Sequence, residues 1–354
     1  MTRRRPPGSE RVLLIGNYGN GNVGDDAILI LMAPQALAHG TVTALSRHPA
    51  RICDLAPEVV ALPMLSVAAL TAFLRSDTVV IGGGGMFGRS LPPLVALLPF
   101  VLLAACHLGK DVELRAVGAY PDMPIPVGWA LRKVALRARH ASARDVASVE
   151  ALGGSDQVTL VRDPAWDLPA ADPEQVEAVL TAAGVEGTSP LIAVSLKPGP
   201  GEPTLHRCVA NMAAGLDRWA ADHDGQIVFL PFSDKGDYQL GADLTDDHLG
   251  RLLVSSMVHG HRVRLIAPGL HPTIMRGIVG RCAAVVAMRL HAQIFAASAG
   301  RPVFGLSFEW KCDEFLASVG VAAVRPGEFS ADQLGTWLDE AVPRSSSRQH
   351  SGQP

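Results

Sequence analysis

Residues 284–306 read AVVAMRLHAQIFAASAGRPVFGL. The apolar run Ala284–Ala287 predicts a strand, because an unbroken apolar run fits a strand that is buried on both faces. The alanine-rich segment that follows it predicts a helix, which Gly300 and Pro302 bring to an end. A second apolar run, Val303–Leu306, predicts another strand. A strand, a helix and a strand in this order are typical of a βαβ unit, whose two strands are parallel.

The same alternation extends over the whole chain. Short apolar runs predict strands at Val12–Ile15, Val42–Leu45, Thr78–Ile81, Glu113–Val117, Val158–Val161, Leu191–Leu196, Gln226–Leu230, Val263–Ile266, Ala284–Ala287 and Val303–Leu306. Residues 169–189, rich in Pro, Gly and acidic residues, separate the first half of these strands from the second. We therefore predict an α/β fold with two Rossmann-like domains that face a central cleft, since ligands of open parallel sheets lie at the carboxyl ends of the strands. The predicted parts are a disordered tail (1–10), an N-terminal domain (11–168), an interdomain connection (169–189), a C-terminal domain (190–342) and a second disordered tail (343–354).

Composition narrows the possible functions. Of the 354 residues 48% are hydrophobic, and the net charge of −3 gives no basic excess of the kind that nucleic-acid-binding proteins show. The 5 cysteines are odd in number and widely spaced, so they predict neither a disulfide framework nor a zinc site. The apolar run after the basic N-terminus is too short for a signal peptide, and we expect a cytoplasmic protein with reduced thiols.

One apolar segment, residues 91–108, holds three prolines and no Asp, Glu, Lys or Arg. A membrane-spanning helix needs about 20 apolar residues, so we predict a helix that is buried behind the site. The alternative is a patch that contacts a membrane surface, which would place the protein at the inner face of the membrane.

Two glycine-rich loops follow predicted strands in the first half. Residues 16–26 read GNYGNGNVGDD and lead into a predicted helix, whose first N–H groups attract anions. Residues 82–85 are four glycines, which suit a close approach of the backbone to a ligand. Neither loop is a P-loop or a dinucleotide fingerprint, so a nucleotide cofactor is not expected. The candidate ligand-facing residues are Asn17, Asn22, Asp25, Asp26, Gly83, Gly84 and Gly85. In the alternative interpretation Asp25 or Asp26 caps the helix and the glycines only let the two loops pack together.

In the second half, Arg289 and His291 stand at a predicted strand-to-helix turn. Arginine offers a planar fork to phosphate or carboxylate, and histidine exchanges a proton near neutral pH. Lys197, Glu309 and Lys311 follow other predicted strands, and we expect them at the same cleft. Solvated surface charges are the alternative for these three. We recognise no cluster of metal ligands.

Taken together, these motifs resemble those of the polysaccharide pyruvyl transferase family. The segments that resemble it are GNYGNGNVGDDAIL (16–29), VVIGGGGMFG (79–88), RDPAW (162–166), AVSLKP (193–198), FLPF (229–232) and MRLHAQIFAASAGRPVFGLSFEWKCDEFL (288–316). In order and spacing the resemblance extends over residues 12–319, nearly the whole predicted folded chain.

The resemblance implies a glycosyltransferase-B-like arrangement, with the acceptor on the N-terminal domain and the donor on the C-terminal domain. It implies transfer of the pyruvyl group of phosphoenolpyruvate, as co-substrate, onto two hydroxyls of a saccharide. This chemistry needs no redox cofactor, and the sequence leaves open whether a divalent metal assists. Arg289, supported by Lys197, would bind the donor. His291 would supply a proton to it, and Asp25 or Asp26 would take the hydroxyl proton. The product would be a cyclic pyruvate ketal in a cell-surface polysaccharide or glycoconjugate.

Two features depart from the family pattern. Lys197 stands where relatives often have arginine, and residues 115–121 lack the usual Gly-x-Gly-Pro. Two other functions therefore stay open: a nucleotide-sugar-dependent glycosyltransferase, and a non-catalytic member with a degenerate site. The sequence leaves open whether the acceptor is free, nucleotide-linked or lipid-linked, and which oligomer forms. The acceptor loops are expected at 199–205 and 236–249.

Overall fold

The computed structural model describes residues 8–88, 91–199, 201–235 and 244–343, so the two predicted tails lie almost entirely outside the described residues. The chain divides into two compact units, residues 1–168 and 169–354. Residues 169–189, predicted as a connection, belong to the second unit. Within that unit, the Ala171 N–H donates to the Thr273 carbonyl at 2.9 Å, and the helix at residues 173–182 packs against the helix that contains Thr273.

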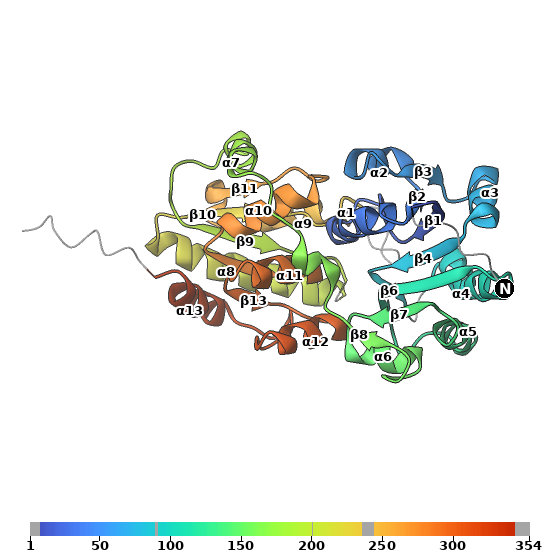
Figure 1. Cartoon of the computed structure of the whole chain (residues 1–354). Coiled ribbons are helices and arrows are strands. Elements are labelled where there is room, and N and C mark those ends of the chain that lie inside the picture. The colour runs from blue at the N-terminus through green and yellow to red at the C-terminus, as the bar shows by residue number, and fades with distance from the viewer. Residues whose placement is uncertain (1–7, 89–90, 200, 236–243, 344–354) are drawn as a thin grey trace, which may run out of the picture. The chain divides into compact units, whose positions relative to one another are not determined.

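The first unit is built on a parallel sheet (Figure 1). Its strands are β1 (Glu10–Ile15), β2 (Gly40–Ser46), β3 (Val60–Pro63), β4 (Thr78–Gly82), β5 (Gly85–Phe87), β6 (Asp111–Ala119), β7 (His140–Ala143) and β8 (Thr159–Leu160). Its helices are α1 (Val23–Leu37), α2 (Pro49–Leu55), α3 (Val67–Arg75), α4 (Pro93–His107), α5 (Ile125–Ala135), α6 (Val146–Leu152) and the 3-10 helix η1 (Pro164–Asp167). The strand order is β3-β2-β1-β4-β6-β7-β8, with β5 paired to β6, and the paired strands are parallel.

Alternating side chains of the strands separate the two faces of this sheet. On β1, Leu13 and Ile15 join a buried cluster with Ala69 of α3, Leu102 of α4 and Leu131 of α5. The opposite face is covered by α1 and α2, which both pack against β2. One helical layer therefore consists of α3, α4 and α5.

Helix α4 corrects the prediction of a fully buried helix. Only Pro99, Leu102 and Ala105 are buried along its length, because only one side of α4 faces the sheet. The opposite side is exposed and apolar. Among the described residues, no helix combines the length and the apolar character that crossing a membrane would require.

The second unit repeats the same architecture around a smaller sheet. Its strands are β9 (Leu191–Ser195), β10 (Gln226–Phe229), β11 (Val263–Leu265), β12 (Ala284–Ala287) and β13 (Val303–Gly305). Its helices are α7 (Pro173–Ala182), α8 (Glu202–Asp222), α9 (Asp246–Ser256), α10 (Pro272–Arg281), α11 (Leu290–Ser298), α12 (Trp310–Ser318), α13 (Ala331–Ala341) and the 3-10 helix η2 (Gly260–Arg262). The order β11-β10-β9-β12-β13 is parallel throughout. Helix α8 packs against α9 and α13, and α11 packs against α10 and α12, which gives two helical layers.

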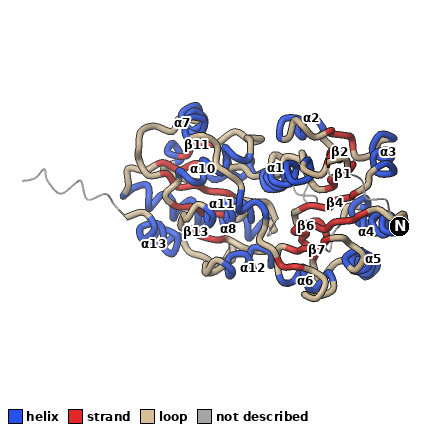
Figure 2. Tube along the Cα trace, viewed as in Figure 1, coloured by secondary structure: helices blue, strands red, loops and turns tan. Residues whose placement is uncertain are grey.

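Each predicted strand coincides with an observed one, and the prediction of an α/β fold with two Rossmann-like domains is confirmed. Figure 2 shows the strands of each unit inside and the helices around them. Strands β3, β5 and β7 were not predicted. Because each sheet is parallel, the loops after its strands gather at one edge of that sheet.

Candidate functional site

The carboxyl edge of the first sheet is built around the start of α1. The Asn22 side chain caps this helix, since its Oδ1 accepts from the Gly24 N–H at 3.0 Å and from the Asp25 N–H at 3.4 Å. The cap is therefore neither Asp25 nor Asp26, which corrects that alternative. Asn22, a predicted ligand-binding residue, has its side-chain oxygen occupied by this cap.

Asp25 is buried beneath the two glycine loops. The Asn17 Nδ2 donates to its Oδ2 at 2.7 Å, and the side chain of Asn17 is in turn held by Asn20. A Cβ added to Gly84 would lie 2.7 Å from the Asp25 Oδ1, so the second glycine loop lies directly against this carboxylate. Burial, and to a lesser extent the charges of Asp26 and Asp163, raise the pKa of Asp25 to about 6, against the opposing hydrogen bond from Asn17 and the charge of Arg144.

Asp26, its neighbour, has a different environment. Its side chain is fully buried, and Oδ1 accepts from the Gly19 N–H at 2.8 Å. Oδ2 accepts from the Arg51 Nε at 2.7 Å. One oxygen therefore holds the glycine loop and the other holds Arg51 of α2, so Asp26 and Asp25 have different contacts.

The glycines of the second loop meet different neighbours. The Tyr18 hydroxyl donates to the Gly82 carbonyl at 2.7 Å, and a Cβ on Gly82 would lie 2.2 Å from the Met32 Sδ and 2.4 Å from this hydroxyl oxygen. A Cβ on Gly83 would meet Ile28 at 2.4 Å, and one on Gly85 would meet the Tyr120 hydroxyl at 1.9 Å. These glycines allow close packing of the protein, whereas Gly84 meets the carboxylate of Asp25.

Arg144 is a residue of this edge that the sequence argument missed. It follows β7, and its side chain is only 4% exposed. Its Nη1 donates to the Asp163 Oδ2 at 3.1 Å and its Nη2 to the Tyr120 hydroxyl at 3.2 Å. Burial alone would lower the pKa of Arg144, but Tyr120, Asp163 and Asp145 together raise it above its ordinary value. A buried cation thus lies close enough to influence Asp25.

Asp163, in the RDPAW segment, caps a helix. Its Oδ1 accepts from the Ala165 N–H at 3.0 Å, at the start of η1. Its other oxygen holds Arg144. The carboxyl edge of the first sheet therefore gathers Asn17, Asp25, Gly84, Tyr120, Arg144 and Asp163.

At the carboxyl edge of the second sheet, Arg289 holds a buried carboxylate. Its Nε donates to the Asp246 Oδ2 at 2.9 Å and its Nη2 to the Asp246 Oδ1 at 2.5 Å. Asp246 is fully buried and also accepts from the N–H groups of Phe232 and Ser233, at 3.1 and 3.0 Å. Two N–H groups of the guanidinium predicted to bind the donor are therefore directed at Asp246.

Lys197, Glu309 and Lys311 form a second charged cluster at this edge. The Lys197 Nζ donates to the Glu309 Oε1 at 2.6 Å, and the Lys311 Nζ lies 3.0 Å from Oε2. The Lys197 ammonium also lies 5.4 Å from the centre of the Phe308 ring. Burial by itself would raise the pKa of Glu309, but the charges and hydrogen bonds of Lys311 and Lys197 outweigh it and lower this pKa to about 2.

His291 is the second residue of α11, two positions after the cap residue Arg289, and it is partly exposed. The loops after β9, β12 and β13 are neighbours in the sheet, so His291 shares one edge with Lys197 and Glu309. Among these residues, three cations (Lys197, Arg289, Lys311) face two carboxylates (Asp246, Glu309), which leaves one positive charge in excess.

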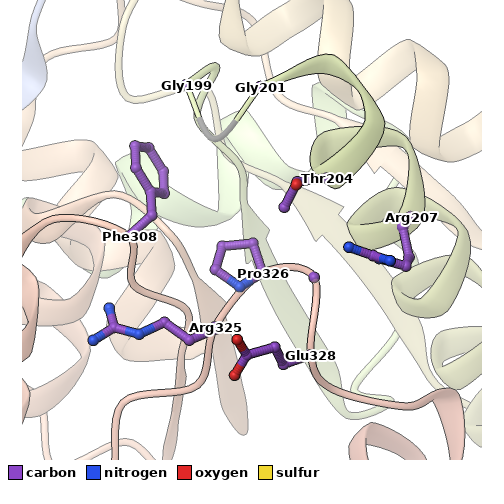
Figure 3. A pocket seen from close by; sticks show the side chains of 9 residues that line it. Gly199, Gly201, Thr204, Arg207, Phe308, Arg325, Pro326 and Glu328 are labelled. Carbon is purple, nitrogen blue, oxygen red and sulfur yellow. The ribbon is translucent and has the colours of Figure 1, made fainter.

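A cavity of about 530 Å³ lies beside this cluster (Figure 3). Its lining residues are Gly199, Gly201, Thr204, Arg207, Phe308, Arg325, Pro326, Gly327 and Glu328. The Arg325 guanidinium points away from the cavity in Figure 3, because Asp313 holds it with two hydrogen bonds of 3.0 Å. Phe308 lines the cavity and also contacts Lys197, so the cavity and the charged cluster are continuous.

Part of one predicted acceptor loop, residues 199–205, lines this cavity. Of the other predicted loop, 236–249, residues 236–243 lie outside the described residues. Its remaining residues begin α9, where Asp246 is bound by Arg289.

Comparisons with solved structures identify the same architecture in sugar-nucleotide enzymes. A UDP-bound structure of MnaA from S. aureus superposes with a TM-score of 0.62 at 13% identity, covering 95% of this chain and 88% of that one. The UDP-GlcNAc 2-epimerase of Methanocaldococcus jannaschii gives 0.60 at 12% identity, covering 94% and 93%. The E. coli ADP-heptose lipopolysaccharide heptosyltransferase II gives 0.54 at 15% identity, covering 94% and 98%. At these identities the likeness shows the fold alone, and it fits the glycosyltransferase-B-like architecture.

A search of curated proteins finds no match to this sequence. The sequence model described as polysaccharide pyruvyl transferase, however, matches residues 22–309. That span includes the loop with Asp25, the four glycines, Lys197, Arg289, His291 and Glu309. The chain belongs to the polysaccharide pyruvyl transferase family.

Proposed function

We propose that this chain transfers the pyruvyl group of phosphoenolpyruvate onto two hydroxyls of a saccharide and forms a cyclic ketal. Membership of the family supports a transferase. One observation supports the donor: Lys197 and Lys311 already hold the carboxylate of Glu309, at 2.6 and 3.0 Å. Phosphoenolpyruvate has both a carboxylate and a phosphate, and the excess positive charge of this edge suits such a compact anion.

In the proposed donor site, Lys197 and Lys311 exchange Glu309 for an anionic group of phosphoenolpyruvate. Arg289 contributes positive charge from its position against Asp246. The N-terminus of α11, where Arg289 is the cap residue, adds a further positive field. Binding by two lysines keeps the charge that arginine would supply but gives up its fork, which fits the departure of Lys197 from the family pattern.

The proposed chemistry needs one proton donor and one proton acceptor. His291 gives a proton to C3 of phosphoenolpyruvate, which makes C2 electrophilic. The first saccharide hydroxyl adds to C2 and loses its proton to Asp25. The bond from C2 to the phosphate oxygen then breaks and phosphate leaves, and the second hydroxyl adds to C2 and returns a proton to His291, which closes the ketal. Asp25 suits the base because its pKa of about 6 makes it a stronger base than an ordinary carboxylate while it is still ionised at neutral pH.

Asp26 and Asn22 have supporting roles in this proposal. Asp26 holds the glycine loop through Gly19 and joins it to Arg51 of α2, and Asn22 caps α1. Phosphoenolpyruvate is a cytosolic metabolite, so a cytoplasmic location follows from the proposal. The product is a building block of a cell-surface polysaccharide or glycoconjugate, and the acceptor's carrier is left open.

The reaction is tested with the purified chain, phosphoenolpyruvate and a panel of saccharides, free and nucleotide-linked. We expect release of phosphate together with a ketal carbon signal in the ¹³C spectrum of the product. Release of a nucleoside diphosphate from a sugar nucleotide, without use of phosphoenolpyruvate, would instead assign a glycosyltransferase. If phosphoenolpyruvate does not raise the thermal midpoint and no nucleoside diphosphate is released either, the chain is a non-catalytic member, because a bound ligand must stabilise the native state.

A further inference from the structure

The outer side of the layer formed by α3, α4 and α5 is apolar. On α3 the exposed positions are Val67, Leu70 and Leu74, and on α4 they include Leu97 and Phe100. On α5 they are Ile125 and Trp129, and Leu136 follows as its cap residue. Along each helix these residues recur three, four or seven positions apart, so they form one stripe that points away from the buried face. We call the eight residues the apolar helix face.

The three helices form a continuous surface within the first unit. They share one buried cluster beneath them, and α4 and α5 pack along each other. Lys110, just after α4, donates to the carbonyls of Leu74 and Ser76 at 2.9 and 2.6 Å and thereby ties the end of α3 to the end of α4. In Figure 1, α3, α4 and α5 follow one another along one side of this unit.

The exposure of this face is unusual for side chains of this size. Ile125 is 84% exposed, Val67 82% and Trp129 50%. Single exposed apolar residues are normal on a protein surface, but a contiguous group on three adjacent helices marks an interaction surface.

The charges around this face indicate its partner. Along their full described lengths, α3, α4 and α5 contain no Asp or Glu, whereas Arg75, Arg132 and Lys133 lie on them and Arg137 follows α5. The chain as a whole has a net charge of −3, so this basic surface is local. In the adjoining loops, Asp77 is paired with Arg11 and Asp111 with Arg139, while Asp122 precedes α5.

We propose that the apolar helix face docks on a lipid surface that contains anionic headgroups. Aliphatic side chains with a tryptophan, flanked by basic residues, are the composition that enters the boundary between headgroups and acyl chains. Basic residues next to such a face are attracted to anionic lipids. A docked chain would meet lipid-carried saccharides at a high local concentration. The inference goes beyond pyruvyl transfer, since docking needs neither phosphoenolpyruvate nor a saccharide.

Flotation with vesicles tests this proposal on the full chain. Vesicles of phosphatidylcholine alone are compared with vesicles that also contain phosphatidylglycerol. We expect the chain to float with the anionic vesicles, less with the neutral ones, and less again when salt is added. The variant F100S/W129S should bind the anionic vesicles at least about tenfold more weakly, because both positions lose the apolar burial that docking provides.

The controls keep the test independent of folding. Both substituted side chains are exposed, so the thermal midpoint should stay that of the parent. The matched variant L160S/V258S removes two exposed apolar side chains elsewhere, of 53% and 84% exposure, and should float like the parent. The variant R132Q/K133Q should lose the preference for anionic over neutral vesicles.

Three results would overturn the proposal. The first is a parent chain that stays at the bottom of the gradient with anionic vesicles. The second is F100S/W129S floating as well as the parent. The third is a dimer in sedimentation equilibrium that F100S/W129S abolishes while the parent does not float, because the face would then join two copies of the chain.

Discussion

The Asp25 Oδ1 lies only 2.7 Å from the position that a Cβ on Gly84 would occupy. The second glycine loop thus closes over the carboxylate without a side chain between them. This contact helps to bury Asp25, and burial raises the pKa of its carboxyl.

Asp25→Asn should abolish ketal formation while leaving phosphoenolpyruvate binding intact, because the donor is assigned to the second unit. In the parent, the transfer rate should rise with pH through about 6, as the carboxylate becomes ionised and able to accept a proton. The measurements are phosphate release against pH and the thermal shift caused by phosphoenolpyruvate. A rate that does not change between pH 5 and pH 7, within the range where Asp25 titrates, would remove it as the base.

The same substitution should raise the stability of the fold above pH 6. A raised folded-state pKa of an acid means that its contribution to stability is present below the unfolded pKa, 3.8, and is lost as pH rises through about 6. At pH 8 the ionised carboxylate of Asp25 therefore lowers the free energy of unfolding by about 3 kcal/mol, and the neutral side chain of Asn avoids this loss. Urea unfolding should give Asp25→Asn a higher free energy of unfolding than the parent at pH 8, and this difference should disappear at pH 4. Asp26→Asn is the control, and it should destabilise at both pH values, because it weakens the contact with Arg51.

Gly84→Ala should reduce activity more than it reduces stability. Gly84 has φ +78°, where an alanine costs about 1–2 kcal/mol, and the new methyl group would press on Asp25. Gly320→Ala is the matched control, since Gly320 has φ +72° and open space around it. Both variants should lose similar stability in urea, and only Gly84→Ala should lose transfer. Equal activity in the two would contradict the contact between Gly84 and the reacting carboxylate.

Asp246→Leu should be strongly destabilising, by about 3–5 kcal/mol, because it leaves the buried guanidinium of Arg289 without this carboxylate. It also removes the acceptor of the Phe232 and Ser233 N–H groups. The double variant Asp246→Leu/Arg289→Met should recover much of this loss, since no uncompensated charge remains. Urea unfolding of the two single variants and the double variant gives the coupling energy. Additive losses would show that the ion pair matters little to the fold.

Lys197→Met should destabilise the second unit at neutral pH, and its difference from the parent should shrink steadily as the pH falls below about 4.5. The depressed pKa of Glu309 means that its stabilisation is present above its ordinary value of 4.5 and fades as pH falls towards about 2. Once Glu309 is protonated in both variant and parent, the missing ammonium matters little. Lys197→Arg keeps the charge and should follow the parent. Thermal midpoints measured from pH 7 to pH 3 check the convergence.

Much of the fold could be predicted from sequence because buried parallel strands are nearly continuous apolar runs. The strands that escaped are those with another composition. In β7 the residues His140–Ala143 are small or polar, β5 begins inside the glycine run, and the short β3 lies at the sheet edge and ends in Pro63. These segments become strands because they pair with neighbouring strands in the sheet, and their local sequence pattern does not predict that pairing.

The candidate site was predictable in its positions but not in its pairings. Arg289 and Lys197 were found at the ends of strands, where they do lie. Their carboxylate partners Asp246 and Glu309 are 43 and 112 residues away in sequence, so no spacing could join them. Arg144 was missed because it follows β7, the strand that had no apolar signal.

Tyr18 joins the two glycine loops by occupying the space that two glycines leave empty. Its ring lies within 2.4 Å of where a Cβ on Gly16 would be, and its hydroxyl lies at the same distance from one on Gly82. The side chains allowed at positions 16, 18 and 82 are therefore sterically coupled, and none of the three can change size independently of the others. A side chain at position 16 or 82 can be accommodated only if Tyr18 is first replaced by a smaller residue. A smaller residue at position 18 would in turn leave a cavity that only new side chains at positions 16 and 82 could fill. In evolution of this chain, a substitution at one of these three positions should therefore be accompanied by a compensating substitution at another.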